Sequence, residues 1–140
     1  NVEFESELHQ KAYDEYMRLG FAKVRSVCAE KDFPLPFILV EPGRSVVAES
    51  GITLYTVGCV KEIKDVRTYV SVDGGMNDNP RYALYKAPYS ADIATKLGQA
   101  KDKIVTIAGR ACESGDLIQE DALVQQVEPG DIMAVLSICF

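Results

Sequence analysis

Short segments rich in Val, Ile, Thr and Tyr recur from residue 45 to the C-terminus, and they constrain the fold more than any other feature. Several such segments at near-regular spacing are typical of a small antiparallel sheet or barrel. The turn Glu128-Pro129-Gly130-Asp131 introduces the last of them. No strand is predicted for the stretches 77–90 and 112–125. The extended segments predicted from this pattern are 45–63, 67–75, 103–109 and 131–140.

The first 44 residues have a different pattern, which predicts one helix or a helix pair followed by a strand. Between residues 7 and 31, apolar side chains fall near a 3.6-residue period, and Gly20 interrupts them. Two prolines between Asp32 and Pro36 end the helix. The apolar run Phe37–Val40 then predicts a buried strand. The apolar positions of the helix are Leu8, Ala12, Tyr16, Leu19, Val24, Val27 and Cys28.

Glu41-Pro42-Gly43-Arg44 follows this strand and places a carboxylate and a guanidinium at its end. Arginine suits a carboxylate or phosphate, and glutamate suits a protonated ring nitrogen. The alternative is a surface turn with a local ion pair. We expect a domain boundary directly after this motif, between residues 1–44 and 45–140.

A second motif, Asp73-Gly74-Gly75-Met76, follows a predicted strand, and adjacent glycines allow the backbone to approach a ligand or another chain closely. Arg81 and Tyr85 lie four residues apart downstream, so a helical turn would place both on one face. Such a pair can bind one anion. The alternative is a surface loop with an exposed arginine.

A third motif, Cys112-Glu113-Ser114-Gly115-Asp116, follows the predicted strand 103–109. The acidic neighbours Glu113 and Asp116 should disfavour the thiolate of Cys112, which suits a proton donor better than a nucleophile. A buried structural thiol is the alternative, and we assign that role to Cys28, Cys59 and Cys139.

The composition excludes several classes of function. A net charge of −6 without any basic stripe argues against binding nucleic acid. No apolar stretch has the length of a membrane span, and residues 1–10 lack the features of a signal peptide. Four scattered cysteines and one histidine, His9, argue against a metal site. We expect reduced thiols in a cytoplasmic protein.

In this order, the three motifs closely resemble the C-terminal half of the diaminopimelate decarboxylase family. These are pyridoxal-phosphate enzymes of the alanine-racemase-like group. The resemblance implies an α+β chain. Residues 1–44 would be the last helix–strand unit of a cofactor-binding (β/α)8 barrel, and residues 45–140 a mainly antiparallel β-barrel-like domain, truncated at its end. It also implies decarboxylation of meso-2,6-diaminopimelate to L-lysine by a homodimer.

The resemblance also implies a role for each motif. Cys112 would return a proton to the carbon that loses CO2, and Glu113 would recognise the distal amino-acid end of the substrate. Both would reach into the partner subunit's site. Arg81 and Tyr85 would bind a substrate carboxylate. The residues expected to bind the cofactor are Glu41, Pro42, Gly43 and Arg44, of which Arg44 also faces the substrate.

The chain departs from the family pattern in ways that bear on activity. None of its lysines matches the one that binds the cofactor covalently in the family, so we expect the isolated 140-residue chain to be inactive. Tyr82 stands where proline is usual, and Lys86 where glycine is usual. Two alternatives stay open: a related decarboxylase acting on ornithine, arginine or carboxynorspermidine, and a non-catalytic homologue that serves as an interaction module.

Overall fold

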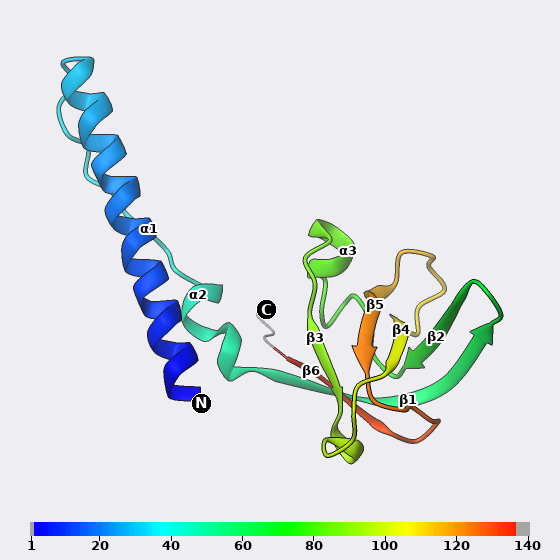
Figure 1. Cartoon of the computed structure of the whole chain (residues 1–140). Helices are drawn as coiled ribbons and strands as arrows, with labels where there is room; N and C mark the ends of the chain where they lie inside the picture. Colours follow the sequence, from blue (N-terminus) through cyan, green and yellow to red (C-terminus); the bar gives the residue numbers. More distant parts are fainter. Residues whose placement is uncertain (1, 137–140) are drawn as a thin grey trace. The chain divides into compact units, whose positions relative to one another are not determined.

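The computed structural model describes the backbone of residues 2–136 and the side chains of residues 14–44 and 46–136. The chain divides into two compact units, Asn1–Ser45 and Val46–Phe140, and each is described by itself (Figure 1). None of the helices in the described part of the chain is long and apolar enough to cross a membrane. The elements, in chain order, are α1 (Val2–Glu30), α2 (Arg44–Val47), η1 (Ala48–Ser50), β1 (Ile52–Ile63), β2 (Arg67–Val72), α3 (Arg81–Tyr85), β3 (Ser90–Ile93), η2 (Ala94–Lys96), β4 (Lys103–Ala108), β5 (Leu117–Val124) and β6 (Ile132–Leu136).

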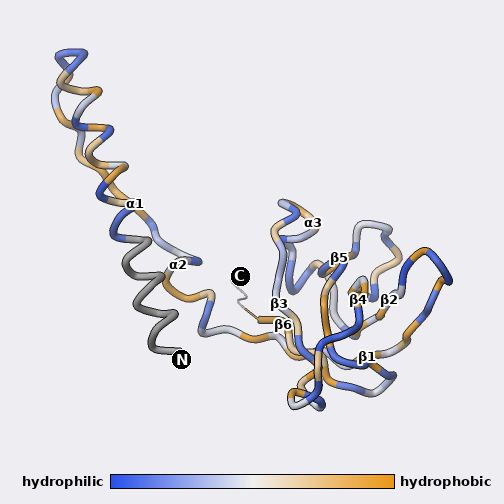
Figure 2. Tube along the Cα trace, in the orientation of Figure 1, coloured by the Kyte–Doolittle hydropathy of each residue, from blue (hydrophilic) through white to orange (hydrophobic). Residues whose placement is uncertain are grey.

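The first unit consists of α1 and the segment that follows it. The helix runs through Gly20 without a break, so the sequence pattern corresponds to one helix rather than a pair. It ends where Asp32 adopts a left-handed conformation (φ 53°) and the Phe33 N–H donates to the Cys28 carbonyl at 2.9 Å. Hydrophilic and hydrophobic residues mix along its described part (Figure 2). The side chains of Leu8 and Ala12, two of the predicted apolar positions, lie outside the described residues.

The strand predicted at Phe37–Val40 is not formed. Phe37 and Leu39 are 90% and 82% exposed. A strand needs a neighbour for its backbone N–H and C=O groups, and no described segment pairs with this one. The extended segment predicted from residue 45 also begins later than expected. Residues 44–50 form α2 and η1, and β1 starts only at Ile52.

The second unit is a six-stranded sheet with the order β3-β6-β1-β2-β4-β5. Four of its strand pairs are antiparallel, and β2 and β4 run parallel, so the prediction of a mainly antiparallel sheet is confirmed. The strands predicted at 67–75, 103–109 and 131–140 correspond to β2, β4 and β6, although residues 137–140 lie outside the described part. The turn before β6 is formed, with Gly130 at φ 91° and the Asp131 N–H donating to the Glu128 carbonyl at 3.1 Å.

Three elements lie in stretches for which no strand was predicted. The stretch 77–90 contains α3 and the start of β3, and the stretch 112–125 contains β5. Strand β5 carries Glu120 and Asp121, and Asp121 adopts φ 52° within the strand. This irregularity interrupts the alternation of apolar and polar residues that identifies a strand.

Side chains link the two end strands of the sheet, β3 and β5, and nearly close it into a barrel. Gln119 accepts the Tyr89 N–H at 2.8 Å, and Gln125 accepts the Ile93 N–H at 2.7 Å. The Gln125 amide in turn donates to Asp92 Oδ1 at 2.9 Å. The seam between β3 and β5 is therefore bonded through glutamine side chains.

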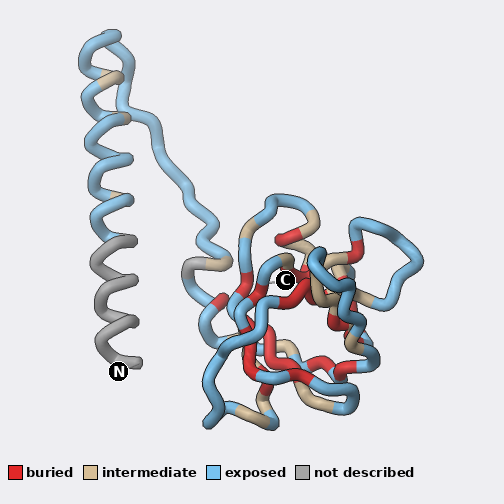
Figure 3. The backbone as a smooth tube through the Cα atoms, turned by 45° about the vertical axis from the view of Figure 1, so that its right-hand side comes forward, coloured by how far each residue is buried: buried red, intermediate tan, exposed pale blue. Residues whose placement is uncertain are grey.

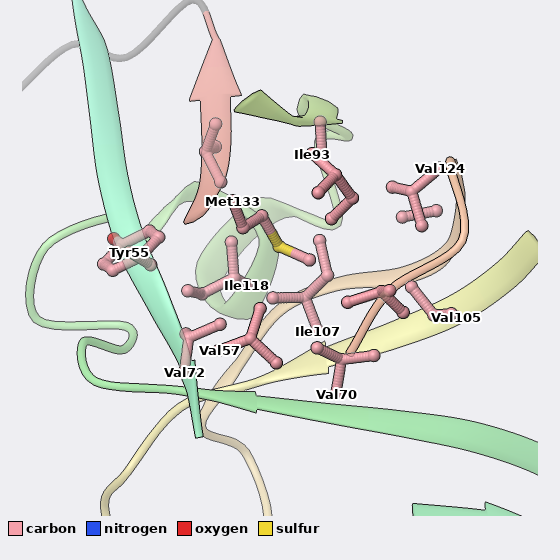
Figure 4. Close-up of a cluster of buried hydrophobic side chains, with 14 of the residues drawn as sticks. Tyr55, Val57, Val70, Val72, Ile93, Val105, Ile107, Ile118, Val124 and Met133 are labelled. Atoms are coloured by element: carbon pink, nitrogen blue, oxygen red, sulfur yellow. The ribbon is translucent and has the colours of Figure 1, made fainter. Parts of the chain in front are cut away.

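The barrel interior is a single cluster of buried side chains, mostly aliphatic, that includes three tyrosines. Ile93, Ile107, Ile118 and Met133 are fully buried, and they converge from four different elements (Figure 4). Buried positions concentrate in this unit, whereas the described part of α1 is mostly exposed (Figure 3). At about 25 cal/mol per Å² of apolar area, such side chains stabilise the fold by ~1.5–3 kcal/mol each. The barrel is thus the rigid frame that carries the loops described next.

Candidate active site

The loop after β2 is held by two aspartates. Asp73 exchanges hydrogen bonds with Thr56: its Oδ1 accepts the Thr56 N–H at 2.8 Å, and its own N–H donates to the Thr56 carbonyl at 3.2 Å. Hydrogen bonding from Thr56 is the main cause that lowers the pKa of Asp73. Asp78 Oδ2 accepts the Gly75 N–H at 3.0 Å and turns the chain toward α3. The loop is therefore fixed at both ends.

The two glycines of this loop lie against side chains of the same chain. A Cβ atom at Gly74 would lie 2.0 Å from a ring carbon of Tyr55, and one at Gly75 would lie 2.6 Å from Asp116 Oδ1. Real Cβ atoms do not approach other atoms so closely, so any side chain here would displace its neighbour. The glycine pair therefore allows close approach of Tyr55 and Asp116 of the same chain, and the approach of a ligand or another chain stays a prediction.

Asp116 joins the second and third motifs. Asp116 is 3% exposed, and its carboxylate accepts the Met76 N–H at 2.6 Å and the Ala111 N–H at 2.7 Å. The Arg110 N–H also donates to the Gly74 carbonyl at 2.9 Å. Hydrogen bonds to a charged acceptor are about twice as strong as neutral ones. The structure therefore brings together two loops that are far apart in sequence.

Sequence reasoning missed this role of Asp116 and treated the residue only as an acidic neighbour of Cys112. The available signal was the pair of glycines, Gly75 and Gly109, that lie against its carboxylate. A Cβ at Gly109 would lie 2.2 Å from Asp116 Oδ2, closer than the 2.6 Å between a Cβ at Gly75 and Asp116 Oδ1. Sequence alone does not show that these glycines surround the same side chain.

Cys112 and Glu113 lie on the exposed turn between β4 and β5. Glu113 Oε1 accepts the Gly115 N–H at 3.1 Å and the Ser114 hydroxyl at 3.3 Å. Cys112 is a free, exposed thiol, which argues against the alternative of a buried structural cysteine. Cys59 is also exposed and Cys28 is half-buried, so the buried role predicted for both is wrong. Cys139 lies outside the described residues.

The predicted helical turn is present as α3, and it places Arg81 and Tyr85 one turn apart. Tyr85 is 73% exposed and Arg81 is half-buried. Asn79 anchors the chain just before the helix, because its buried amide donates to the Tyr55 hydroxyl at 2.6 Å and to Thr53 Oγ1 at 3.2 Å. Burial raises the pKa of Tyr55 to about 12.

The first motif belongs to the other unit. Glu41, Pro42 and Gly43 are exposed outside any helix or strand, and Arg44, half-buried, begins α2. Gly130 is the only described glycine with a positive φ, so Gly43 does not use that conformation. Within the described residues, no cluster of three His, Cys, Asp or Glu side chains could hold a metal ion. The structure thus assembles two of the three predicted motifs.

The chain is similar over most of its length to proteins named diaminopimelate decarboxylase. It is 50% identical to the Bacillus subtilis protein over 121 residues, which cover 86% of this chain and 28% of the relative. It is 40% identical to the Synechocystis protein, with coverages of 87% and 26%. The chain therefore spans about a quarter of the length of these relatives.

Solved structures give the same result. The M. jannaschii diaminopimelate decarboxylase matches with a TM-score of 0.61 at 35% identity, over 81% of this chain and 26% of that one. The Helicobacter pylori enzyme complexed with L-lysine matches with a TM-score of 0.60 at 37% identity, over 69% of this chain and 23% of that one. Residues 12–139 match the family described as pyridoxal-dependent decarboxylase, C-terminal sheet domain. The chain belongs to this family of pyridoxal-dependent decarboxylases.

Proposed function

We propose that the whole protein decarboxylates meso-2,6-diaminopimelate to L-lysine and CO2, using pyridoxal 5'-phosphate, in the cytoplasm. The observation that carries this proposal is the 50% identity to the Bacillus subtilis relative of that name. The relative from Helicobacter pylori that was solved with L-lysine is consistent with the same product. Residues 1–44 would complete the cofactor-binding barrel, and residues 45–140 would be the sheet domain.

The chemistry of the first motif fits the cofactor. Glu41 can pair with a protonated pyridine nitrogen, and Arg44 can pair with the phosphate or with a substrate carboxylate. Apart from its chain neighbours Pro42 and Arg44, no described residue has an atom within 4 Å of a Cβ built at Gly43, which leaves room for an anion beside this backbone. When bound, the cofactor withdraws the electron pair that remains when CO2 leaves.

The other two motifs would bind the substrate and supply a proton. Arg81 and Tyr85 would bind the distal carboxylate, and Glu113 would pair with the distal amino group, since a charge buried without a partner is costly. The Cys112 thiol would donate a proton to the carbon that has lost CO2. Its exposed position on a turn held by Asp116 supports this role.

The proposal is tested with a substrate panel on the complete enzyme. We expect CO2 release from meso-diaminopimelate and little from ornithine, arginine or carboxynorspermidine, which lack the distal amino-acid centre. Cys112→Ala should lower kcat by ~10²–10⁴-fold, the usual range for a lost proton donor. Cys59→Ala, which removes another exposed thiol, is the matched control and should leave kcat unchanged. Preference for ornithine would favour the related-decarboxylase alternative instead.

A mixing experiment tests whether the sites are shared in a homodimer. We expect Cys112→Ala and Arg81→Ala subunits, each nearly inactive alone, to regain up to a quarter of the wild-type activity when they are co-refolded. Restoration arises because one site of the mixed dimer carries neither substitution. No recovery in a verified mixed dimer would contradict sharing. The isolated 140-residue chain with added pyridoxal phosphate should release no CO2.

A further inference from the structure

Helix α3 depends on contacts with the barrel for its position. It has five residues, too few for an isolated helix to persist in water. Tyr85 and Leu84 are 73% and 65% exposed, whereas Tyr82 is 9% exposed and belongs to the core cluster. Tyr82 is therefore the residue of α3 whose side chain is buried against the sheet, and the Arg81 N–H adds a hydrogen bond to the Tyr89 hydroxyl at 3.3 Å.

The hydroxyl of Tyr82 belongs to a network of polar and charged side chains that connects α3, β5 and β2. It donates to Glu120 Oε2 on β5 at 2.5 Å, and the other oxygen of this carboxylate accepts Arg67 Nη1 from β2 at 2.6 Å. Lys86 follows α3 directly. Its Nζ lies 3.9 Å from Glu120 Oε2 and 4.7 Å from the centre of the Tyr82 ring. Glu120 thus ties α3 to two strands of the barrel at once.

The charge distribution favours this network at neutral pH. The hydrogen bond from Tyr82 is the main cause that lowers the pKa of Glu120, and the same bond raises the pKa of Tyr82. Both shifts keep the phenol neutral and the carboxylate ionised. The bond is therefore charge-assisted, and it is stronger than a bond between neutral groups.

We propose that Tyr82, Glu120 and Arg67 are positioning residues that orient α3 so that Arg81 and Tyr85 meet the substrate. This inference rests on the proposed function. Arg81 and Tyr85 share a face of a helix whose neighbouring face is fixed by Tyr82. A freely tilting α3 would have to be ordered at each binding event, and that cost would weaken substrate affinity. The network should therefore affect binding more than the chemical step.

The experiment uses Tyr82→Phe in the complete enzyme, because this substitution removes one oxygen and keeps the buried ring. We expect KM for meso-diaminopimelate to rise about tenfold, as for loss of a hydrogen bond to a charged group, with kcat within twofold. Tyr69→Phe on β2 is the matched control, since the Tyr69 ring lies 5.9 Å from the Arg67 guanidinium and its hydroxyl bonds to no described residue. Glu120→Gln should itself raise KM. Adding Tyr82→Phe to the Glu120→Gln variant should then raise KM little further.

Hydrogen exchange of the substrate-free enzyme provides a second readout. The Leu84 and Lys86 amides donate within α3 to the Pro80 and Tyr82 carbonyls, both at 2.9 Å. Tyr82→Phe should speed their exchange several-fold, and Tyr69→Phe should not. Unchanged KM, a loss of kcat alone, or an equal effect of the control would each overturn the inference. A wild-type enzyme inactive on every substrate would refute the proposed function, while faster exchange would still support the attachment of α3.

Discussion

Gly109→Ala tests whether Asp116 holds the two loops of the candidate site together. The new Cβ would lie 2.2 Å from Asp116 Oδ2 and 2.4 Å from its Cγ. Since the carboxylate is buried, it must leave its position and lose the N–H groups of Met76 and Ala111. Gly98→Ala is the matched control, because no atom lies within 4 Å of a Cβ at Gly98 and its φ is not positive.

The expected loss of stability follows from the two bonds that are broken. A hydrogen bond to a charged group contributes about 1.5–3 kcal/mol, so Gly109→Ala should cost at least ~3 kcal/mol. The displaced carboxylate regains part of its hydration, which makes the lower end of the range the better expectation. Gly98→Ala should be neutral or stabilise the fold by about 0.4–1 kcal/mol, because it restricts the unfolded chain.

Urea unfolding followed by tyrosine fluorescence measures these differences, since the chain has no tryptophan and seven tyrosines. Asp116→Ala provides the decisive background, because it removes the carboxylate. In this variant, Gly109→Ala should lower the free energy of unfolding by less than about 1 kcal/mol. An equal cost of Gly109→Ala with and without the Asp116 side chain would refute the reasoning. A cost as small as that of Gly98→Ala would refute it too.

Three further predictions concern the barrel. Hydrogen bonds from Tyr82 and Arg67 lower the pKa of Glu120 below 4.5, so its contribution to stability is complete above that pH and is lost as the pH falls through the lowered pKa. The Tm difference between the wild type and Glu120→Gln should therefore shrink below pH 4.5, and a pH-independent difference would contradict this. Tyr55, with its pKa raised to about 12, should ionise near pH 12 in an ultraviolet titration, and stability should fall between about pH 10 and 12; Tyr55→Phe should remove that step. Gly130→Ala should cost about 1–2 kcal/mol through backbone strain alone, since φ is 91° and no atom lies within 4 Å of the new Cβ; an unchanged urea midpoint would disprove it.

The parts of the fold that could be predicted from sequence are those with strong local signals. Strands β2, β4 and β6 are β-branched runs bounded by turn residues, and the Pro129-Gly130 turn has the geometry that these residues favour. Strand β5 was missed because Gln119 is buried for its hydrogen bond to the Tyr89 N–H just before β3, a long-range reason that no local pattern contains. The strand expected at Phe37–Val40 failed for the opposite reason: its local signal is strong, but it has no neighbouring strand among the described residues.

The candidate site was predictable as a set of motifs but not as an arrangement. The spacing of Arg81 and Tyr85 predicted a shared helical turn, and α3 confirms it. The contact between the loops around Gly75 and Cys112 depends on the pairing of β2 with β4 and on one buried carboxylate. Neither is encoded by local spacing. The roles of these residues in catalysis remain predictions for the experiments above.

The glutamine seam between β3 and β5 also affects how this chain behaves in a crowded solution. An open sheet exposes two edges whose free N–H and C=O groups can recruit strands from other molecules. Here Gln119 and Gln125 occupy edge N–H groups of Tyr89 and Ile93 with their side chains. These N–H groups are therefore not free to pair with a strand of another molecule. We expect replacement of Gln125 by leucine to promote fibrillar or amorphous association of the protein more than it lowers its melting temperature.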